Sequence, residues 1–188
     1  MLRQATCIRV LIVVAAISSL AQAANKPAQR QMQLQLTAKP DRLVYRMSDT
    51  IKVQTQLLNT GIGDVYVWGS DLCWNMARGL SIYLVRSDGS PARGKVLFDC
   101  LPPPPSNGEA EGFLKLRAGA SHATSDDFTA SDLVDKPGEY DLQITFTSFL
   151  SRKWIRQFYP SKPIAKLPIW TLEEPKLTSP RVHLTIKP

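Results

Sequence analysis

The sequence contains few of the residues on which common metal and catalytic sites depend. It has two histidines, His122 and His183, and three cysteines in 188 residues. It contains no Gly-x-Ser-x-Gly nucleophile turn, no His-Glu-x-x-His zinc motif and no glycine-rich phosphate loop. These absences exclude the familiar hydrolase, metalloprotease and nucleotide-binding signatures, so we expect a protein that is not an enzyme and has no metal and no cofactor.

Long apolar runs are also lacking, and the run near the N-terminus is short. Residues 10–20 form it, and these 11 residues fall well below the roughly 20 that a bilayer-spanning helix needs. Arg3 and Arg9 precede the run without any acid, and Ala21 and Ala23 follow it at the positions that a signal peptidase reads. The pattern predicts a signal peptide over residues 1–23 rather than an uncleaved anchor.

Export fixes the expected compartment and size of the protein. Removing the first 23 of 188 residues leaves 165, which suits one domain. The net charge of +7 falls to +5, because the leader carries two arginines and no acid. This mild excess favours anionic surfaces but is not a nucleic-acid signature. We therefore expect a periplasmic or extracellular protein with no membrane span after cleavage and no nucleic-acid partner.

Two cysteines, Cys73 and Cys100, remain once the leader and its Cys7 are removed. In an oxidising compartment such a pair predicts a disulfide bond. The loop-entropy model gives that bond roughly 3.5 kcal/mol of stabilisation. The alternative is a reactive thiol or a metal pair, although neither cysteine has a second ligand at metal-binding spacing.

Alternation of apolar and polar residues with a period of two runs through most of the remaining chain. It is clearest in residues 32–36, 51–57, 80–84, 140–146 and 182–186. Shorter strands are expected at 43–45, 65–68, 96–98, 113–116 and 123–128. Helical periodicity is absent apart from a single turn near 131–134. The pattern predicts an all-β protein, a single antiparallel β-sandwich with long loops over residues 31–188, after a short polar linker at 24–30.

The segment DKPGEYDL at residues 135–142 resembles the tyrosine corner of immunoglobulin-like domains. In that corner a tyrosine at the start of strand F bonds back to the chain at the preceding turn, the role that the resemblance implies for Tyr140. Leu142 stands where antibody domains place their second core cysteine. The order of elements over residues 32–188 is similar to that of secreted bacterial immunoglobulin-like (fibronectin-like) domains of uncharacterised function. Such a resemblance implies a scaffold and transfers no functional residue.

A basic and aromatic segment follows the expected strand at 140–146. From residue 152 to residue 166 there are five cations and no acid, with three interspersed aromatic residues. Cations beside aromatic rings bind sugars or anionic polymers. Alternatively, the aromatic side chains pin a long loop to the sandwich while the cations stay in water. The candidate binding surface comprises Arg152, Lys153, Trp154, Arg156 and Tyr159.

Four successive prolines form a second candidate feature. Pro102, Pro103, Pro104 and Pro105 offer no backbone N–H donors and predict a stiff polyproline II segment. Such a segment is either a preformed ligand for an aromatic groove or a rigid crossover between strands.

The remaining ionisable residues are expected at the surface. His183 alternates with Val182 and Leu184, so it should face away from the core. The acidic pairs at 126–127 and 173–174 are adjacent residues, which point to opposite faces of a strand, and we interpret them as solvated charges rather than as a catalytic dyad or a calcium site.

These observations favour a non-catalytic, exported binding or interaction module of the cell envelope. The expected surface combines the segments 69–79, 100–112 and 151–166, and the expected partner is an envelope polysaccharide or another exported protein. One alternative is a protein inhibitor whose disulfide-stiffened proline loop occupies a partner's cleft. The other is an enzyme of unrecognised type.

Overall fold

The computed structural model describes residues 32–72, 74, 79–90, 92, 112–160 and 162–188. Met32–Pro188 forms one compact unit, distinct from Met1–Gln31. Five expectations fall outside the described residues: the signal peptide, the linker, the Cys73–Cys100 disulfide, the strand at 96–98 and the segment Pro102, Pro103, Pro104 and Pro105.

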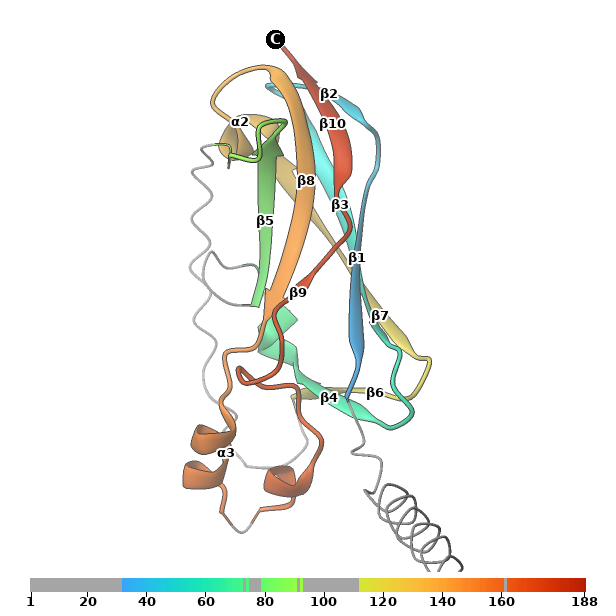
Figure 1. The fold of residues 1–188 in the computed structure, drawn as a ribbon, viewed down its shortest axis with the longest axis vertical. Coiled ribbons are helices and arrows are strands. Elements are labelled where there is room, and N and C mark those ends of the chain that lie inside the picture. Colours follow the sequence, from blue (N-terminus) through green and yellow to red (C-terminus); the bar gives the residue numbers. More distant parts are fainter. Residues whose placement is uncertain (1–31, 73, 75–78, 91, 93–111, 161) are drawn as a thin grey trace, which may run out of the picture. The chain divides into compact units, whose positions relative to one another are not determined.

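One sheet is built from strands β1 (Leu34–Pro40), β3 (Thr50–Asn59) and β7 (Ser121–Thr129), in the order β1-β3-β7. Both pairings in this sheet are antiparallel, as Figure 1 shows. In β3, Ile51, Val53 and Leu57 are buried, whereas Lys52, Gln54 and Gln56 are exposed. The alternation expected at 51–57 is therefore confirmed, and it sets which face of the sheet meets the core.

The second sheet has the order β2-β10-β8-β5, from strands β2 (Val44–Arg46), β10 (Val182–Lys187), β8 (Gly138–Thr147) and β5 (Gly79–Arg86). A short strand, β9 (Leu177–Thr178), also pairs with β8. The expected antiparallel pairing is wrong for β2 and β10, which run parallel. After β1 the chain crosses to the other sheet and continues beside the last strand, where no hairpin links the two.

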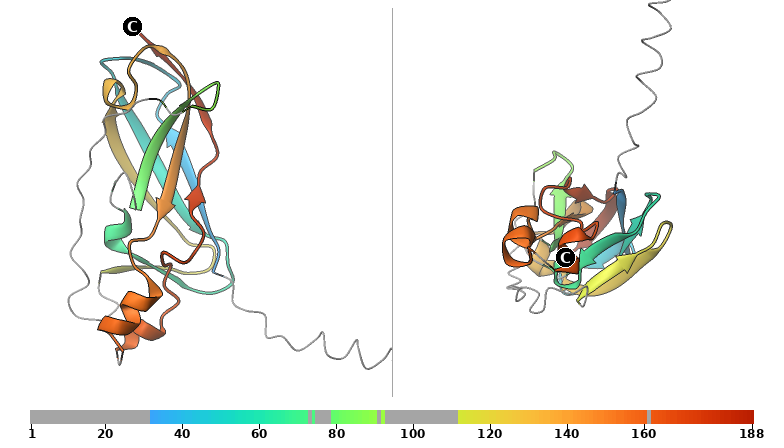
Figure 2. Two further views of the ribbon diagram at one scale, coloured as in Figure 1. Left: turned by 60° about the vertical axis from the view of Figure 1, so that its left-hand side comes forward. Right: turned by 90° about the horizontal axis from the view of Figure 1, so that it is seen from below.

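These orders match those of an immunoglobulin-like sandwich, with β1-β3-β7 as strands A, B and E and β5-β8-β10 as strands C, F and G. Figure 2 shows the two sheets as facing layers. The main core lies between them and includes fully buried Leu142, Ile144, Phe146, Leu184 and Ile186. The expectation of an all-β fold is confirmed at this level.

The smaller elements gather mostly at one end of the sandwich. Strands β4 (Val65–Trp68) and β6 (Phe113–Leu116) form a two-stranded ribbon. The 3-10 turn η1 (Gly69–Leu72) directly follows β4 in the chain. The expected turn near 131–134 is the short helix α2 (Ala130–Leu133). No other helix was expected, yet the structure has α3 (Arg152–Phe158) and the 3-10 turn η2 (Pro163–Lys166). Among the described residues, no helix is long and apolar enough to cross a membrane.

Tyr140 forms the corner that its sequence context predicts. Its side chain is 2% exposed, and its hydroxyl donates a hydrogen bond of 2.7 Å to the Lys136 carbonyl oxygen. Gly138 lies against the ring, where an added Cβ would come within 3.4 Å of Tyr140 Cε2. The corner fixes the start of β8, the strand that leads toward α3.

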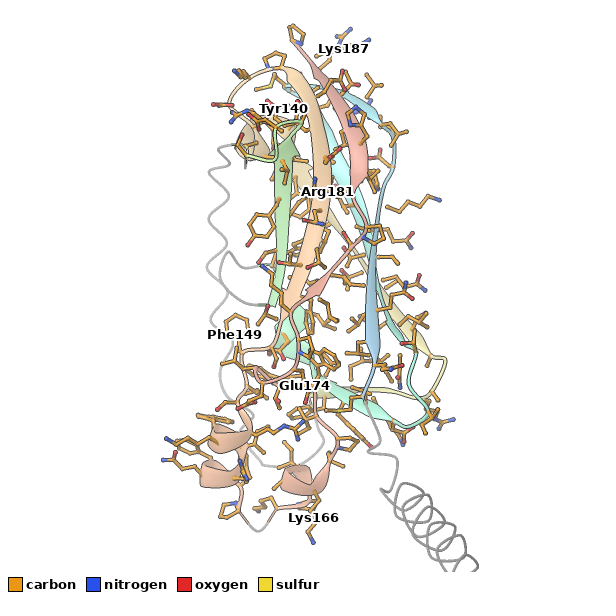
Figure 3. All side chains as sticks on the ribbon, viewed as in Figure 1. Tyr140, Phe149, Lys166, Glu174, Arg181 and Lys187 are labelled. Atoms are coloured by element: carbon orange, nitrogen blue, oxygen red, sulfur yellow. The ribbon has the colours of Figure 1, made fainter. Side chains whose placement is uncertain are left out.

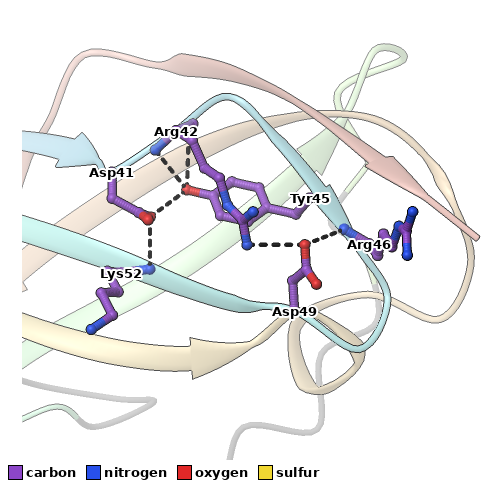
Figure 4. Close-up of polar contacts among 6 residues, drawn as sticks. All are labelled: Asp41, Arg42, Tyr45, Arg46, Asp49 and Lys52. Carbon is purple, nitrogen blue, oxygen red and sulfur yellow. Dashed lines mark hydrogen bonds and ion pairs between the residues drawn. The ribbon is translucent and has the colours of Figure 1, made fainter.

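A second buried tyrosine, which the sequence analysis did not single out, holds the crossing between the sheets (Figure 4). The Tyr45 hydroxyl lies 2.8 Å from both its acceptors, the Asp41 carboxylate and the Arg42 carbonyl oxygen. Asp49 accepts hydrogen bonds from the Arg42 guanidinium and the Arg46 N–H, each at 2.9 Å. Burial and the hydrogen bond to Asp41 raise the pKa of Tyr45 to about 12. The phenol therefore stays protonated and acts as a structural donor.

Candidate binding pocket

Helix α3 occupies the part of the chain that the sequence analysis interpreted as a long basic and aromatic loop. Ser151 caps it, because the Ser151 hydroxyl oxygen accepts a hydrogen bond of 3.0 Å from the Trp154 N–H. The helix ends before Pro160, whose ring disfavours helical backbone at the preceding residue. The structure thus corrects the prediction of a loop. Seven residues with a single buried position are too few to show helical periodicity.

A second apolar cluster holds α3 in place. Its buried members are Trp68, Leu150, Ile155, Ile164 and Ile169. Ile169 belongs to a segment pinned to β4: the Tyr66 N–H donates to the Pro168 carbonyl at 2.9 Å, and the Trp170 N–H donates to the Tyr66 carbonyl at 2.8 Å. We call α3, η2 and residues 148–151 and 167–174 the α3 region.

A pocket of about 210 Å³ lies within the α3 region. Buried isoleucines from α3, η2 and the pinned segment line its apolar part. Its full lining comprises Arg152, Ile155, Arg156, Ile164, Ala165, Leu167, Ile169 and Thr171. The charged groups in this lining are the guanidinium groups of two arginines. They can attract and hold an anion through several N–H donors.

The predicted binding residues lie on two flanks of α3 rather than on one surface. At 100° per residue, Arg152 and Arg156 fall on one side of buried Ile155, whereas Trp154 and Phe158 fall on the other. The Trp154 ring packs against Phe158 at 4.9 Å and against Tyr159 at 5.7 Å between ring centroids. Cations thus line the pocket, while the aromatic residues contact one another.

The two pocket arginines differ in their partners. The Arg152 guanidinium pairs with the Glu174 carboxylate, and its backbone N–H donates to both Glu173 carboxylate oxygens at 3.0 Å. By contrast, Arg156 has no acidic partner among the described residues, and its Nε donates to the Arg152 carbonyl oxygen at 3.3 Å. Exposed Lys153 lies outside the pocket lining. Arg156 is therefore the pocket cation with an uncommitted charge.

The acidic pair at 173–174 is not simply solvated, as the sequence analysis expected. Both carboxylates bind Arg152, the first residue of α3, and the Glu174 side chain is only 19% exposed. Burial acts to raise the pKa of Glu173, but the hydrogen bond from the Arg152 N–H helps bring it below its ordinary value. The pair thus balances part of the positive charge of the basic segment, from a position beyond that segment's end.

Asp71, in η1, is a buried carboxylate that no sequence motif indicated. Its oxygens accept hydrogen bonds from the Ser148 hydroxyl at 2.6 Å and from the Phe149 N–H at 2.8 Å. Burial raises the pKa of Asp71 to about 6, although both hydrogen bonds oppose this change. Figure 3 shows Phe149, Glu174 and Lys166 at one end of the molecule, with Tyr140 and Lys187 at the other. Asp71 therefore ties η1 to the start of the α3 region.

The other ionisable residues are distributed across the sandwich. The Asp126 carboxylate accepts a hydrogen bond from the Trp74 indole, so the expectation that Asp126 is simply a solvated charge is wrong. The Asp127 carboxylate lies 3.7 Å from the Lys52 ammonium. His183 is exposed, in agreement with its expected position, and its two ring nitrogens lie 3.0 Å from Asp141 and Glu139. The residues that the structure describes hold no group of three or more His, Cys, Asp or Glu side chains suited to a metal ion.

The comparisons with known proteins find likenesses of fold at low similarity. No protein-family model and no curated protein matches the sequence. Among solved structures, the chain is similar to the CARDB domain of the PF1109 protein from Pyrococcus furiosus, solved in complex with di-metal ions: identity is 9%, the TM-score is 0.39, and the match covers 84% of this chain and 94% of that one.

Two β-glucosidases also show a partial likeness. The enzyme from Listeria innocua, in complex with glucose, is 11% identical with a TM-score of 0.37, over 84% of this chain and 16% of the enzyme. The enzyme EmGH1 from Erythrobacter marinus is 12% identical with a TM-score of 0.35, over 82% of this chain and 15% of that chain. At such scores these likenesses carry no argument about activity. The assignment to an immunoglobulin-like sandwich therefore rests on the strand order and the tyrosine corner.

Proposed function

We propose that this protein is a non-catalytic, exported binding module of the cell envelope, and that the pocket face of its α3 region binds an anionic partner. Another exported protein is the partner that we favour. The observation that carries the proposal is Arg156, an exposed cation without an acidic partner among the described residues, in the lining of a pocket that it shares with three buried isoleucines.

The chemistry of the pocket supports binding rather than catalysis. Its ionisable lining consists of guanidinium groups, which hold anions through charge-assisted hydrogen bonds. A polysaccharide would instead stack on exposed aromatic rings. Here the Trp154 ring packs against its own neighbours, on the flank of α3 that does not line the pocket.

A capture experiment tests the proposal. The mature protein is immobilised and exposed to envelope extract, and separately to purified acidic envelope polysaccharide. The double variant Lys153→Ser/Arg156→Ser should lose at least about tenfold in capture of its partner, since charge-assisted contacts contribute roughly 1.5–3 kcal/mol each. Arg152 stays unchanged, because its pairing with Glu174 holds α3 in place.

A matched variant separates this site from general charge effects. Lys39→Ser/Lys187→Ser removes the same charge from two exposed strand positions of the sandwich. Capture should fall with salt above ~0.15 M in the unchanged protein and in this control. Equal capture by both double variants would overturn the proposed site, and capture of polysaccharide alone would replace the proposed partner.

Export and the disulfide belong to the same proposal. Cleavage after Ala23 gives an N-terminus at Ala24, which mass spectrometry of the exported protein checks directly. A non-reducing peptide map of the same material should link Cys73 to Cys100. An intact Met1 on protein free of membranes, or two free thiols, would contradict these two parts of the proposal.

A further inference from the structure

We infer that the pocket of the α3 region binds a carboxylate carried on a short apolar group. An apolar C-terminal residue of a peptide chain has this chemistry, and so does a short-chain fatty acid. The inference rests on the proposed function and names the ligand group that enters the pocket.

The apolar part of the ligand is set by the three isoleucines. Ile155, Ile164 and Ile169 are at most 4% exposed, and they come from three separate segments of the chain that converge on the pocket. An aliphatic group placed against them leaves water, which stabilises the complex by roughly 25 cal/mol per Å² of buried apolar surface. The pocket lining includes no aromatic residue, so it offers a sugar ring no platform on which to stack.

The anionic part of the ligand is set by Arg156. Among the described residues, Arg156 donates only its Nε, to the Arg152 carbonyl oxygen, so the rest of its guanidinium fork remains available. The Thr171 hydroxyl, which also lines the pocket, is buried beside the Glu173 carboxylate and favours its charged form, so this hydroxyl is not available to a ligand. A ligand carboxylate beside Arg156 would accept charge-assisted hydrogen bonds from the remaining N–H groups of its guanidinium.

The dimensions of the pocket limit the apolar group to one side chain. The volume of about 210 Å³ is below the roughly 300–1,000 Å³ of pockets that enclose drug-sized ligands. A leucine-sized group fits this space, whereas a folded element or an oligosaccharide does not. The rest of a peptide would therefore lie along the exposed cationic flank of α3.

Binding of small probes tests the inference on the mature protein. N-acetyl-leucine is titrated while the Ile155, Ile164 and Ile169 methyl resonances are followed, with Ile51 in the sandwich core as an internal control. We expect saturable shifts at the three pocket methyls and none at Ile51. N-acetyl-leucine amide has the same apolar group without the charge, and it should bind at least about tenfold more weakly.

Two substitutions locate the anion. Arg156→Gln should weaken N-acetyl-leucine binding about tenfold. Lys166→Gln is the matched control, because it removes one positive charge from an exposed position in η2, outside the pocket lining. Unchanged Ile51 shifts verify that each variant is folded.

The outcomes separate the inference from the proposed function. Equal binding of the acid and the amide, or equal losses in Arg156→Gln and Lys166→Gln, would overturn the carboxylate site. If partner capture still depends on Arg156 in that case, the proposed function stands and only the ligand group is wrong. Hexanoate and a peptide ending in leucine are then compared: tighter binding of the peptide identifies a protein terminus, and tighter binding of hexanoate identifies a fatty acid.

Discussion

The β-sandwich and the α3 region are stabilised by different arrangements of buried residues. In β8 every second residue is buried, and Tyr140, Leu142 and Ile144 are each at most 2% exposed. In the α3 region each short element contributes one anchor, such as Ile155 from α3 and Ile164 from η2. A repeated pattern distributes the burial over many residues, whereas single anchors leave the position of a segment dependent on one side chain.

The two regions also differ in how charged groups are used. On the sandwich, ion pairs such as Lys52–Asp127 lie on exposed strand surfaces and join residues on paired strands. In the α3 region, Glu173 and Glu174 bind Arg152, which lies 21 and 22 positions earlier in the chain. Buried Asp71 accepts a hydrogen bond from Ser148, which lies 77 positions later. The region that carries the pocket therefore depends on contacts between residues far apart in the sequence.

The largest expected effect comes from creating a cavity in each region. Leu142→Ala should lower the free energy of unfolding by about 3–5 kcal/mol, because the position is fully buried between rigid sheets. Ile155→Ala should cost about 2 kcal/mol, since a short helix can shift to fill the space. Urea unfolding followed by circular dichroism measures both. A loss for Ile155→Ala as large as that for Leu142→Ala would show that the two regions form one equally rigid core.

The second effect is a pH dependence of stability from Asp71. Burial raises its folded pKa to about 6 from an ordinary 3.8, so the folded protein binds this proton more tightly than the unfolded chain. The stabilising contribution is therefore complete below pH 3.8 and is lost as the pH rises through 6. The loss amounts to roughly 3 kcal/mol, at about 1.4 kcal/mol per pKa unit.

Asp71→Asn, which cannot ionise, should remove this part of the pH dependence. The difference in unfolding free energy between the variant and the unchanged protein is measured at pH 4 and pH 7, where it should change by most of the amount given above. Hydrogen exchange of buried amides in the sandwich core should slow at pH 5 relative to pH 7, after correction for intrinsic rates, because the free energy of unfolding is larger at the lower pH. Parallel pH profiles for the two proteins would rule out the effect.

The third effect is confined to the sandwich. Tyr140→Phe should cost about 1–2 kcal/mol, because the Lys136 carbonyl oxygen loses its donor in a part-buried position. The global unfolding transition should move while pocket binding of N-acetyl-leucine stays unchanged. A Tyr140→Phe variant as stable as the unchanged protein would mean that the corner hydroxyl contributes nothing beyond packing of the ring.

The smallest effect concerns an exposed group and contrasts with buried Asp71. The hydrogen bond to Asp141, helped by the charge of Glu139, raises the pKa of His183 above its ordinary 6.5. Stability from this contact is present below pH 6.5 and is lost as the pH rises through the higher folded pKa. An NMR titration of the His183 ring should show the raised pKa, and Asp141→Asn should lower it. An unchanged pKa in that variant would show that the 3.0 Å contact is not populated in solution.

The sequence predicted the sandwich because its signal is local and repeated. Strands β3 and β8 were visible as alternation over seven or more residues, and the corner was visible because Lys136 and Tyr140 are only four positions apart. The parallel pairing of β2 with β10 left no local signal, since it joins residues near the two ends of the unit. The Asp41–Tyr45 contact is equally local, and its spacing of four residues was a signal that could have been read.

What the sequence by itself determined, then, is which faces of the strands are buried, where the tyrosine corner lies and which residues of the basic segment carry charge. Tertiary structure alone decided that the segment is helical and that its cations and aromatic residues lie on separate flanks. It also decided that, among the described residues, Arg152 has an acidic partner beside the pocket and Arg156 has none. The physical reason is how far apart in the sequence the interacting residues lie. A strand's buried face follows from residues two positions apart, whereas the pocket exists only when segments near 155, 164 and 169 converge and Glu174 takes up the Arg152 charge.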